Sequence, residues 1–307
     1  ICDQDTAKAR QIAQDLGVRT ASFNDILEDP SVDVIDIAIP NKFHAQFVIS
    51  ALAAGKTVWC EKPLAPTVEE CKAILRATNN SRNRLKVGSN VRFFPNVLKV
   101  KELIGDGKMG QPLFFRGYIG NSGNHLKTSV WYSDPSLIGG GTLLDNGVHL
   151  IDLVRWLIGE IEMCQATVCN QLWKIDNLED LAMCIFHLAN GARAFIQSSW
   201  TEWSGYMYFE IYGSEGFIRS DNRFSMAKVA VGTSKGVSQE FDYSTLPPAS
   251  YSNELNDFVD RYLAGLDFEP SGYDGYRAVK IVRSCYESAR SGKAIPTFDA
   301  SDHWPLL

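Results

Sequence analysis

The chain has 307 residues, of which 45% are hydrophobic, and its formal net charge is -6 at pH 7. This length favours two domains with full hydrophobic cores. Because the balance of charge is mildly acidic and no Lys/Arg-rich block occurs, the composition argues against nucleic-acid binding. No apolar run reaches the length of a membrane span and no signal peptide is recognisable, so we expect a cytoplasmic protein without a membrane partner.

The cysteines are scattered and include no C-x-x-C pair. Cys164 and Cys169 lie five residues apart in a strand-like run, so they point to opposite faces and cannot share one metal ion. We therefore expect reduced thiols and no metal site. The seven are Cys2, Cys60, Cys71, Cys164, Cys169, Cys184 and Cys285.

The chain begins with Ile1, Cys2 and Asp3, and a helical pattern follows at residues 6–16. This order is typical of the end of a buried strand that leads into a helix. In a dinucleotide-binding fold, an acidic residue at the end of the second strand accepts hydrogen bonds from the adenosine ribose. Asp3 is placed for that role, and the alternative is a solvated carboxylate near the terminus.

Strand and helix patterns alternate from residue 32 to about Gly107. Strict alternation predicts an α/β domain with a Rossmann-like, doubly wound parallel sheet. The continuous apolar run at the start is typical of a buried parallel strand. The predicted strands are residues 32–39, 57–60 and 85–89, and the predicted helices are residues 45–54, 68–78 and one that ends near Gly107.

Candidate binding residues follow the first of these strands, because the carboxyl ends of parallel strands face the ligand crevice. Pro40 and Asn41 come directly after residues 32–39, and His44 opens the next helix. His44 is either a contact of the cofactor or a packing residue at the start of that helix.

The strand at residues 57–60 leads into Glu61, Lys62 and Pro63. Pro63 ends the strand at the point where these side chains would emerge into the crevice. Lys62 is therefore a candidate cation of an active site. The alternative is an exposed Glu-Lys pair with no function.

Residues 139–159 form the second candidate segment, GGGTLLDNGVHLIDLVRWLIG. Their pattern predicts a buried helix of about four turns, with Thr142 as N-cap and an end at Gly159. Asp145, His149 and Asp152 then share one stripe, so a carboxylate could orient the histidine as a proton acceptor. The alternatives are a capping box between Thr142 and Asp145 and a histidine that only packs in the core.

The second half of the chain is richer in strands. Consecutive strands without helices between them, with a hairpin turn at Asn190 and Gly191, predict an α+β domain with a large, open, mostly antiparallel sheet. We expect one face to pack on the helix of residues 139–159. The predicted strands are residues 112–121, 161–173, 181–188, 192–203, 206–212 and 217–219, and helices are predicted at residues 252–263 and 276–291.

These patterns place a dinucleotide-binding domain at residues 1–95 and a substrate and oligomerisation domain at residues 96–307. The other face of the large sheet is expected to carry aromatic side chains and to bury itself against a copy of the chain, as a homodimer or homotetramer. These aromatic residues are Trp200, Trp203, Tyr206, Tyr208 and Phe209.

Several segments together resemble one family. TVWCEKPLA holds Glu61, Lys62 and Pro63, and the GGG-x-x-x-D-x-G-x-H pattern holds Asp145 and His149. With IAIPNKFHAQFVISALAAGKTVWCEKPLA, GSNVRFFP and LEDLAMCIFHLANGARAFIQSSW, they resemble the glucose-fructose oxidoreductase and inositol dehydrogenase (Gfo/Idh/MocA) group over essentially the whole chain. The resemblance implies an NAD(P)-dependent enzyme that moves a hydride between nicotinamide and a secondary hydroxyl of a sugar, sugar derivative or cyclitol.

The resemblance also implies the roles of individual residues. His149 would be the general base, Asp145 would orient it and bind a substrate hydroxyl, and Lys62 would stabilise the developing alkoxide, although Lys62 could instead be the base. The implied cofactor contacts are Asp3, Pro40, Asn41, His44, Glu61, Lys62, Pro63 and Asn90, and the implied substrate contacts are Lys62, Arg92, His125, Trp131, Asp145 and His149.

Three of these residues have an alternative interpretation. Arg92 could bind substrate or form a salt bridge between the domains. In the polar loop of residues 120–134, His125 could bond a hydroxyl and Trp131 could stack on a sugar ring, or both could be exposed loop residues. The family's closing helix, expected at about residues 275–291, packs back on the first domain.

The cofactor expected from the resemblance is NAD. Asp3 is not followed by an arginine, and a carboxylate at this point would repel the 2'-phosphate of NADP. The G-x-G-x-x-G turn that cradles the phosphates does not occur in this sequence, so we expect roughly the first thirty residues of a parent protein to be missing. Without that turn, inactivity of the polypeptide by itself is an open alternative.

Two other functions are compatible with the same fold. A glycosidase of this fold uses tightly held NAD to oxidise a sugar transiently, so that NADH would not accumulate. A sugar or dinucleotide sensor, such as the galactose-pathway repressor that resembles these enzymes, would not catalyse a reaction. The presence of Lys62, Asp145 and His149 together argues against the sensor.

Overall fold

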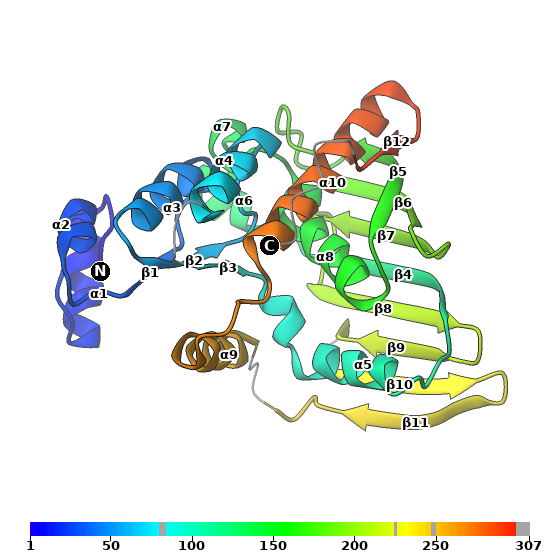
Figure 1. The fold of residues 1–307 in the computed structure, drawn as a ribbon. Coiled ribbons are helices and arrows are strands. Elements are labelled where there is room, and N and C mark those ends of the chain that lie inside the picture. The colour runs from blue at the N-terminus through cyan, green and yellow to red at the C-terminus, as the bar shows by residue number, and fades with distance from the viewer. Residues whose placement is uncertain (80–83, 224–225, 247–249, 299–307) are drawn as a thin grey trace.

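The computed structural model describes residues 1–79, 84–223, 226–246 and 250–298, which form a small parallel sheet and a large mixed sheet (Figure 1). Helices α1 (Thr6–Leu16) and α2 (Phe23–Glu28) precede the small sheet. Its strands are β1 (Val34–Ile37), β2 (Thr57–Glu61) and β3 (Leu85–Gly88), in the order β1-β2-β3 and parallel throughout.

Helices α3 (His44–Ala53) and α4 (Val68–Asn79) connect these strands. Apolar side chains from β2, β3, α3 and α4 form one core, in which Val48, Val58 and Ile74 are fully buried. The predicted Rossmann-like parallel sheet is confirmed. Its carboxyl ends lead into a short 3-10 turn, η1 (Asn41–Phe43), the segment after Glu61 and a second turn, η2 (Asn90–Phe93).

The large sheet has nine strands in the order β11-β10-β9-β8-β4-β7-β6-β5-β12. Its neighbours pair antiparallel except β4 and β7, which are parallel, so the prediction of a mostly antiparallel sheet is confirmed. The strands are β4 (Pro112–Gly120), β5 (Ile161–Cys169), β6 (Leu181–Leu188), β7 (Arg193–Ser199), β8 (Tyr206–Gly213), β9 (Phe217–Asp221), β10 (Lys228–Thr233), β11 (Gly236–Asp242) and β12 (Ile295–Pro296).

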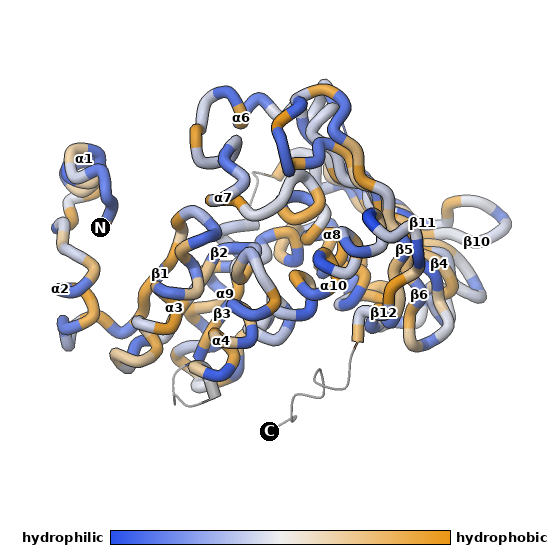
Figure 2. The backbone as a smooth tube through the Cα atoms, turned by 90° about the horizontal axis from the view of Figure 1, so that it is seen from above, coloured by the Kyte–Doolittle hydropathy of each residue, from blue (hydrophilic) through white to orange (hydrophobic). Residues whose placement is uncertain are grey.

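Helices α8 (Val148–Leu157) and α10 (Gly272–Ser291) lie between the two sheets in both backbone views (Figures 1 and 2). Helix α10 contacts α4 and β3 on one side and β5 and α8 on the other. Helix α5 (Pro95–Gly105) packs on β9 and β10, and α9 (Ser250–Ala264) packs on η2. The proposed boundary between residues 95 and 96 therefore stays a prediction, since α10 joins both parts.

Some elements differ from those expected. The start at residues 1–3 is not a strand, although Ile1 does bond to Arg19 and Ala21. The pattern did not predict α2, β10 or β11. In α2 and β11 polar residues interrupt the apolar periodicity: all residues of α2 are at least partly exposed, and β11 is exposed along most of its length. In β10 the buried apolar run of residues 229–231 is too short to be recognised from the sequence.

Two of the aromatic residues expected on the outer face of the large sheet lie elsewhere. Phe209 is fully buried in the core beneath α8, because it alternates with Tyr208 along β8. Trp200 follows the end of β7 and is buried beside the loop that precedes α8. Tyr206 and Tyr208 remain partly exposed on the outer face, and Trp203 is 92% exposed.

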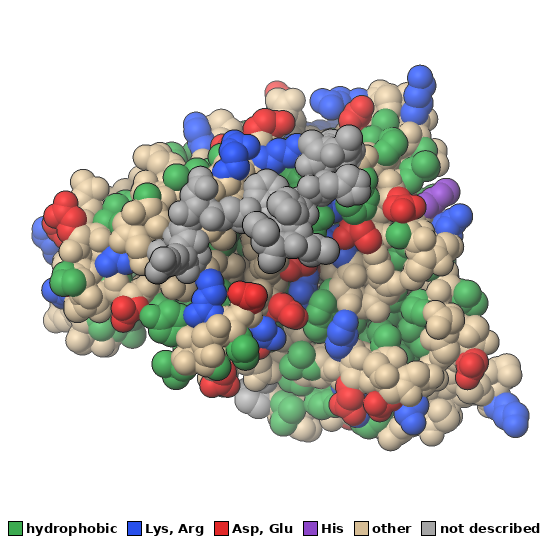
Figure 3. All heavy atoms as spheres, in the orientation of Figure 1, with side chains coloured by type: hydrophobic (Ala, Val, Ile, Leu, Met, Phe, Trp, Pro, Cys, Tyr) green, Lys and Arg blue, Asp and Glu red, His purple; other side chains and the backbone are tan. Residues whose placement is uncertain are grey.

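None of the described helices is long and apolar enough to cross a membrane. All seven cysteines are unpaired. On the face seen in Figure 3, Lys and Arg side chains are interspersed with Asp and Glu.

Candidate active site

Lys62 lies directly after β2 and reaches the segment before α8. Its Nζ donates hydrogen bonds to the backbone oxygen of Asp145 at 2.9 Å and to Oδ1 of the same residue at 2.8 Å. The other carboxylate oxygen, Oδ2, accepts a bond from the indole Nε1 of Trp200 at 3.2 Å. These bonds bring together residues that are far apart in the sequence.

Asp145 lies in a π-helical turn, η4 (Leu143–Gly147), and not in an α-helix that begins at Thr142. Thr142 makes no side-chain cap, and its hydroxyl is buried without a partner among the described residues. The structure therefore does not have the alternative capping box between Thr142 and Asp145. Asp145 therefore does not lie on one regular α-helix with His149 and Asp152, which belong to α8.

Glu179, just before β6, takes the place of the expected cap. Its carboxylate accepts bonds from the backbone N–H groups of Gly141 at 3.0 Å and Leu143 at 2.8 Å, and from the hydroxyl of Tyr286 at 2.9 Å. Gly141 fits because a Cβ there would lie 2.0 Å from the backbone oxygen of Glu179. Sequence reasoning missed this residue, and its only local indication was an acidic side chain at the start of a buried strand.

His149 lies in the first turn of α8 and is only 7% exposed. It lines the same cavity as Lys62. Burial and, second, the positive charge of Lys62 lower the pKa of His149 from 6.5 to about 3. The imidazole is therefore neutral near pH 7, which is the state that a proton acceptor requires.

Lys62 and Asp145 each stabilise the charged form of the other. Burial opposes the charged form of Lys62, but the Asp145 carboxylate outweighs it and raises the pKa of the ammonium. Burial likewise opposes ionisation of Asp145, whereas Lys62 lowers the pKa of that carboxyl below its usual value. Both groups are therefore ionised near neutral pH, and Lys62 is a donor there.

The expected orientation of His149 by Asp145 differs from the structure. Both Asp145 oxygens are bonded, to Lys62 and to Trp200, and no described group bonds the buried Nδ1 of His149. Asp145 acts on the histidine only through its charge. The carboxylate instead holds the lysine in place.

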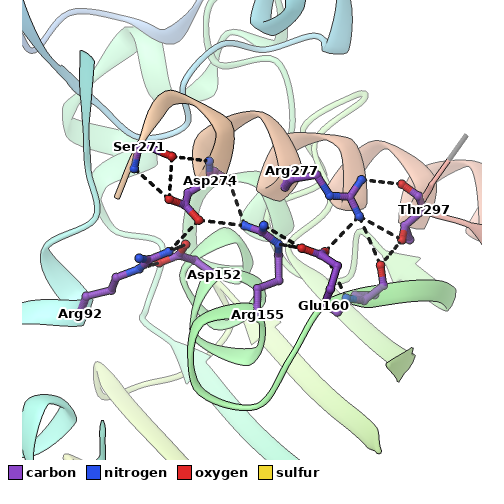
Figure 4. A network of polar contacts seen from close by, with 9 residues as sticks. Arg92, Asp152, Arg155, Glu160, Ser271, Asp274, Arg277 and Thr297 are labelled. Carbon is purple, nitrogen blue, oxygen red and sulfur yellow. Dashed lines mark hydrogen bonds and ion pairs between the residues drawn. The ribbon is translucent and has the colours of Figure 1, made fainter. Parts of the chain in front are cut away.

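Arg92 is 3% exposed and pairs with carboxylates on α8 and α10 (Figure 4). Its guanidinium donates to Asp152 at 2.7 Å and 2.5 Å, and lies 3.4 Å from Asp274. Asp274 also pairs with Arg155 at 3.4 Å. This placement favours the alternative given above, a salt bridge between the two parts of the chain.

His44 and Asn41 are buried rather than open to the crevice. The ring nitrogens of His44 lie 2.9 Å and 2.8 Å from the backbone oxygens of Pro63 and Ile39, which favours its role as a packing residue. The amide of Asn41 donates to the backbone oxygen of Ile138 at 2.8 Å. These bonds fix the segments on which Pro40 and Lys62 lie.

The loop before α8 brings aromatic rings towards Lys62 and Asp145. His125 packs edge-on against Tyr132 and Trp200, with ring centres 4.7 Å and 5.3 Å apart. Tyr132, which sequence reasoning missed, lies close enough for its pKa to be raised by burial and by the charge of Asp145. An aromatic wall of this kind is suited to the apolar face of a sugar ring.

A hollow of about 770 Å³ borders β1, which is an edge strand of the described parallel sheet. Asp3, Pro40 and Trp131 are among the residues that line it. Its size lies in the roughly 300–1,000 Å³ range of small-molecule sites, and it extends to the carboxyl end of a parallel strand. The size of the hollow and its lining by Asp3 and Pro40, two of the predicted cofactor contacts, are compatible with NAD.

Asn90 and Glu61 complete the predicted cofactor residues. Asn90 Nδ2 donates to Ser250 at 3.3 Å, and Glu61 ends β2 in a partly buried position. Burial raises the pKa of Glu61. Among the described residues, no three His, Cys, Asp or Glu side chains are grouped to hold a metal ion.

Comparison with known proteins identifies the family. A family model described as "Oxidoreductase family, NAD-binding Rossmann fold" matches residues 1–89, and one described as "GFO/IDH/MocA C-terminal domain" matches residues 97–219. Levoglucosan dehydrogenase of Pseudarthrobacter phenanthrenivorans is 30% identical over 88% of this chain and 81% of that protein. The chain belongs to this family of oxidoreductases.

Other matches agree. Inositol 2-dehydrogenase 3 of Saccharopolyspora erythraea is 28% identical over 96% of this chain and 86% of that protein. A solved structure of levoglucosan dehydrogenase in complex with NADH and levoglucosan superposes with a TM-score of 0.88 at 28% identity, covering 96% of this chain and 88% of that one. The predictions of family, oxidoreductase activity and NAD as cofactor are confirmed.

Proposed function

We propose that this oxidoreductase oxidises a secondary hydroxyl of a sugar, anhydrosugar or cyclitol with NAD. The observation that carries the proposal is that Lys62, which is bonded to Asp145, and a neutral His149 line the same small cavity. The names of the relatives, a levoglucosan dehydrogenase and an inositol dehydrogenase, support this class of substrate.

In this proposal, His149 accepts the hydroxyl proton and Lys62 donates a hydrogen bond to the oxygen. A histidine with a pKa of about 3 is a weak base in the resting protein. It suffices because the hydroxyl becomes strongly acidic as its carbon loses hydride, so proton and hydride leave in concert. Lys62 is protonated through Asp145, and we therefore assign the role of base to His149 and not to Lys62.

NAD would lie along the carboxyl ends of β1 and β2, held by Asp3, Pro40 and the segment of Lys62. When bound, it supplies the nicotinamide carbon that receives the hydride. The task of the protein is to bring the substrate carbon to that atom and its hydroxyl to His149. His125, Trp131 and Tyr132 would bind the substrate from the loop side.

The direct test incubates the full-length protein with NAD and a panel of anhydrosugars, aldoses and inositols, and follows NADH by its absorbance. Net accumulation of NADH with at least one member is expected. An NAD-dependent glycosidase would release sugar from a glycoside without net NADH, and a sensor would bind without turnover. Either result would contradict the proposal.

We further propose that the chain is a cytoplasmic homodimer or homotetramer, assembled through the outer face of the large sheet. Support comes from partly exposed aromatic side chains there, where Tyr118 packs on Tyr208 and Phe195. Sedimentation velocity is expected to show a dimer or tetramer, and Tyr208→Lys is expected to shift it towards monomer. A wild-type protein that sediments as a monomer would refute the assembly.

A further inference from the structure

A small cavity lies beside His149, between the segment of Lys62, the end of β3 and the helices α8 and α10. Its volume is about 20 Å³, and one buried water molecule needs roughly 10–15 Å³. The cavity therefore has room for a single water. Its polar lining consists of Lys62, Ser89, His149, Asp152 and Asp274.

His149 lines this cavity, and one of its ring nitrogens has no partner among the described residues. Nδ1 is buried, and no group of the described residues bonds it. Because burial and the charge of Lys62 keep the ring neutral, one nitrogen carries a hydrogen and the other a lone pair. The partner of Nδ1 decides which nitrogen is which, and buried polar atoms without a partner are rare.

Acceptors are available across the cavity. The hydroxyl of Ser89 donates to Oδ2 of Asp152 at 3.0 Å, which leaves its own lone pairs free to accept. Asp152 accepts from Ser89 as well as from Arg92, so a carboxylate and a hydroxyl lie together in this wall of the cavity. Lys62 already donates to Asp145, and Asp274 makes no bond to Ser89 among the described contacts.

We propose that a water molecule in this cavity accepts a hydrogen bond from Nδ1–H of His149 and donates to Ser89 and Asp152. The proposal rests on the function given above, because it leaves the lone pair of Nε2 for the substrate hydroxyl. Asp152 is then a positioning residue, since it acts on the base through the water. Asp145, expected from the sequence to orient His149, has the separate task of holding Lys62.

The first test is the tautomer of His149, which needs neither cofactor nor substrate. In protein with nitrogen-15-labelled histidine, the ring signals of His149 are identified by their loss in His149→Gln. At neutral pH we expect a hydrogen on Nδ1 and a bare Nε2. The Nε2–H tautomer in the wild type would overturn the proposal.

Two variants test whether the water sets the tautomer of His149. Ser89→Ala removes one acceptor without a change of charge, and Ala278→Val places a larger side chain in the wall of the cavity, where water would be displaced. Both are expected to populate the Nε2–H tautomer. If both fold, as their circular dichroism will show, and keep the wild-type tautomer, the water has no part in it.

Asp152→Asn is the decisive variant, and Asp274→Asn is its matched control. Both carboxylates pair with Arg92, but only Asp152 bonds Ser89. Asp152→Asn is expected to change the tautomer and to lower kcat roughly tenfold or more with KM little changed, whereas Asp274→Asn keeps the tautomer. An equal change of tautomer in both variants would assign the effect to the loss of the ion pair and refute the proposal.

The two proposals fail separately. NADH formation together with the Nε2–H tautomer would refute the water site and leave the dehydrogenase intact. The Nδ1–H tautomer in a protein that oxidises no sugar or cyclitol would support the water site and refute the function. A crystal structure with a water bonded to His149 Nδ1 and Asp152 would support the site directly.

Discussion

Two polar clusters meet on the helix α8, and they differ in how completely their groups are paired. On one side, Lys62 and Asp145 are paired, but the ring of His149 keeps a nitrogen that no described group bonds. On the other side, acidic and basic side chains alternate in an unbroken series of ion pairs, which we call the paired chain (Figure 4). Each of its members has a partner of opposite charge. Its members are Arg92, Asp152, Asp274, Arg155, Glu160 and Arg277.

The two clusters differ in pairing because one serves to hold the helices in position and the other to carry out chemistry. In the paired chain, partners come from η2, α8 and α10, so the charges tie the exit of the small sheet to both helices. A buried charge with good partners contributes mainly to position. In the His149 cluster, a ring nitrogen has no protein partner, and it is the nitrogen assigned above to a water molecule beside the well-packed core around α8.

The largest effect is expected at the unpaired group itself. His149→Ala removes the proton acceptor, so kcat is expected to fall roughly 10²–10⁴-fold while the affinity for NADH, measured by fluorescence titration, stays nearly unchanged. His187→Ala, an exposed histidine on β6, is the control and should retain full turnover. Wild-type turnover in His149→Ala would exclude this residue as the base.

Removing one cation from the paired chain should lower the free energy of unfolding considerably. Arg92→Met leaves Asp152 buried without its cation and leaves Asp274 with Arg155 alone, so the free energy of unfolding in urea is expected to fall by about 3–5 kcal/mol. The double variant Arg92→Met with Asp152→Leu should lose less, because it removes charge from both sides. A double variant less stable than Arg92→Met would contradict the view that the pair mainly positions the helices.

Gly141 lies just before the π-turn that carries Asp145, and it has no room for a side chain. Gly141→Ala would place a Cβ 2.0 Å from the backbone of Glu179, which must displace the turn that carries Asp145. Since a shift of about 1 Å in a catalytic group costs on the order of 10²-fold in rate, kcat/KM is expected to fall to that extent. Gly105→Ala, where nothing lies within 4 Å, is the matched control. Equal activity of both variants would show that the turn tolerates displacement.

The pH dependence of the free energy of unfolding tests whether His149 is buried as a neutral ring. The pKa of His149 is lowered from 6.5 to about 3 by burial and by Lys62, so the folded protein binds fewer protons than the unfolded chain between these values. The stability that neutral His149 contributes is complete above pH 6.5 and is lost as the pH falls. From pH 7 to pH 5 the wild type is expected to lose about 2 kcal/mol more than His149→Gln, measured by urea unfolding. Equal losses in the two proteins would mean that His149 is not buried as a neutral ring.

The smallest effect concerns a charge that is open to solvent. Asp3 is exposed, so its repulsion of a 2'-phosphate is screened, and Asp3→Ser is expected to narrow the preference for NAD over NADP by less than about tenfold. Asp15→Ser, an exposed carboxylate outside the hollow, should leave the ratio of kcat/KM values unchanged. A wild type that prefers NADP would overturn the role given to Asp3.

Regular elements were predictable where one residue pattern persists. The helix at residues 6–16 and the strand at residues 181–188 have the predicted bounds, because each keeps a single period between clear breaks. The side of β8 on which Phe209 lies was not predicted correctly, since alternation gives two faces without saying which one meets the core. The turn at Asp145 was predicted as α-helical, because nothing local distinguishes it from a π-turn.

The amino-acid sequence by itself determined the family and the two kinds of sheet, and it indicated the candidate residues Lys62, Asp145 and His149. These follow from local patterns and motifs, which are properties of neighbouring residues. Only the tertiary structure decided that Asp145 binds Lys62 rather than His149, and that Arg92 binds Asp152. Each of these pairs joins segments at least sixty residues apart, and the choice among acceptors depends on which side chains the packing of α8 brings within hydrogen-bond distance.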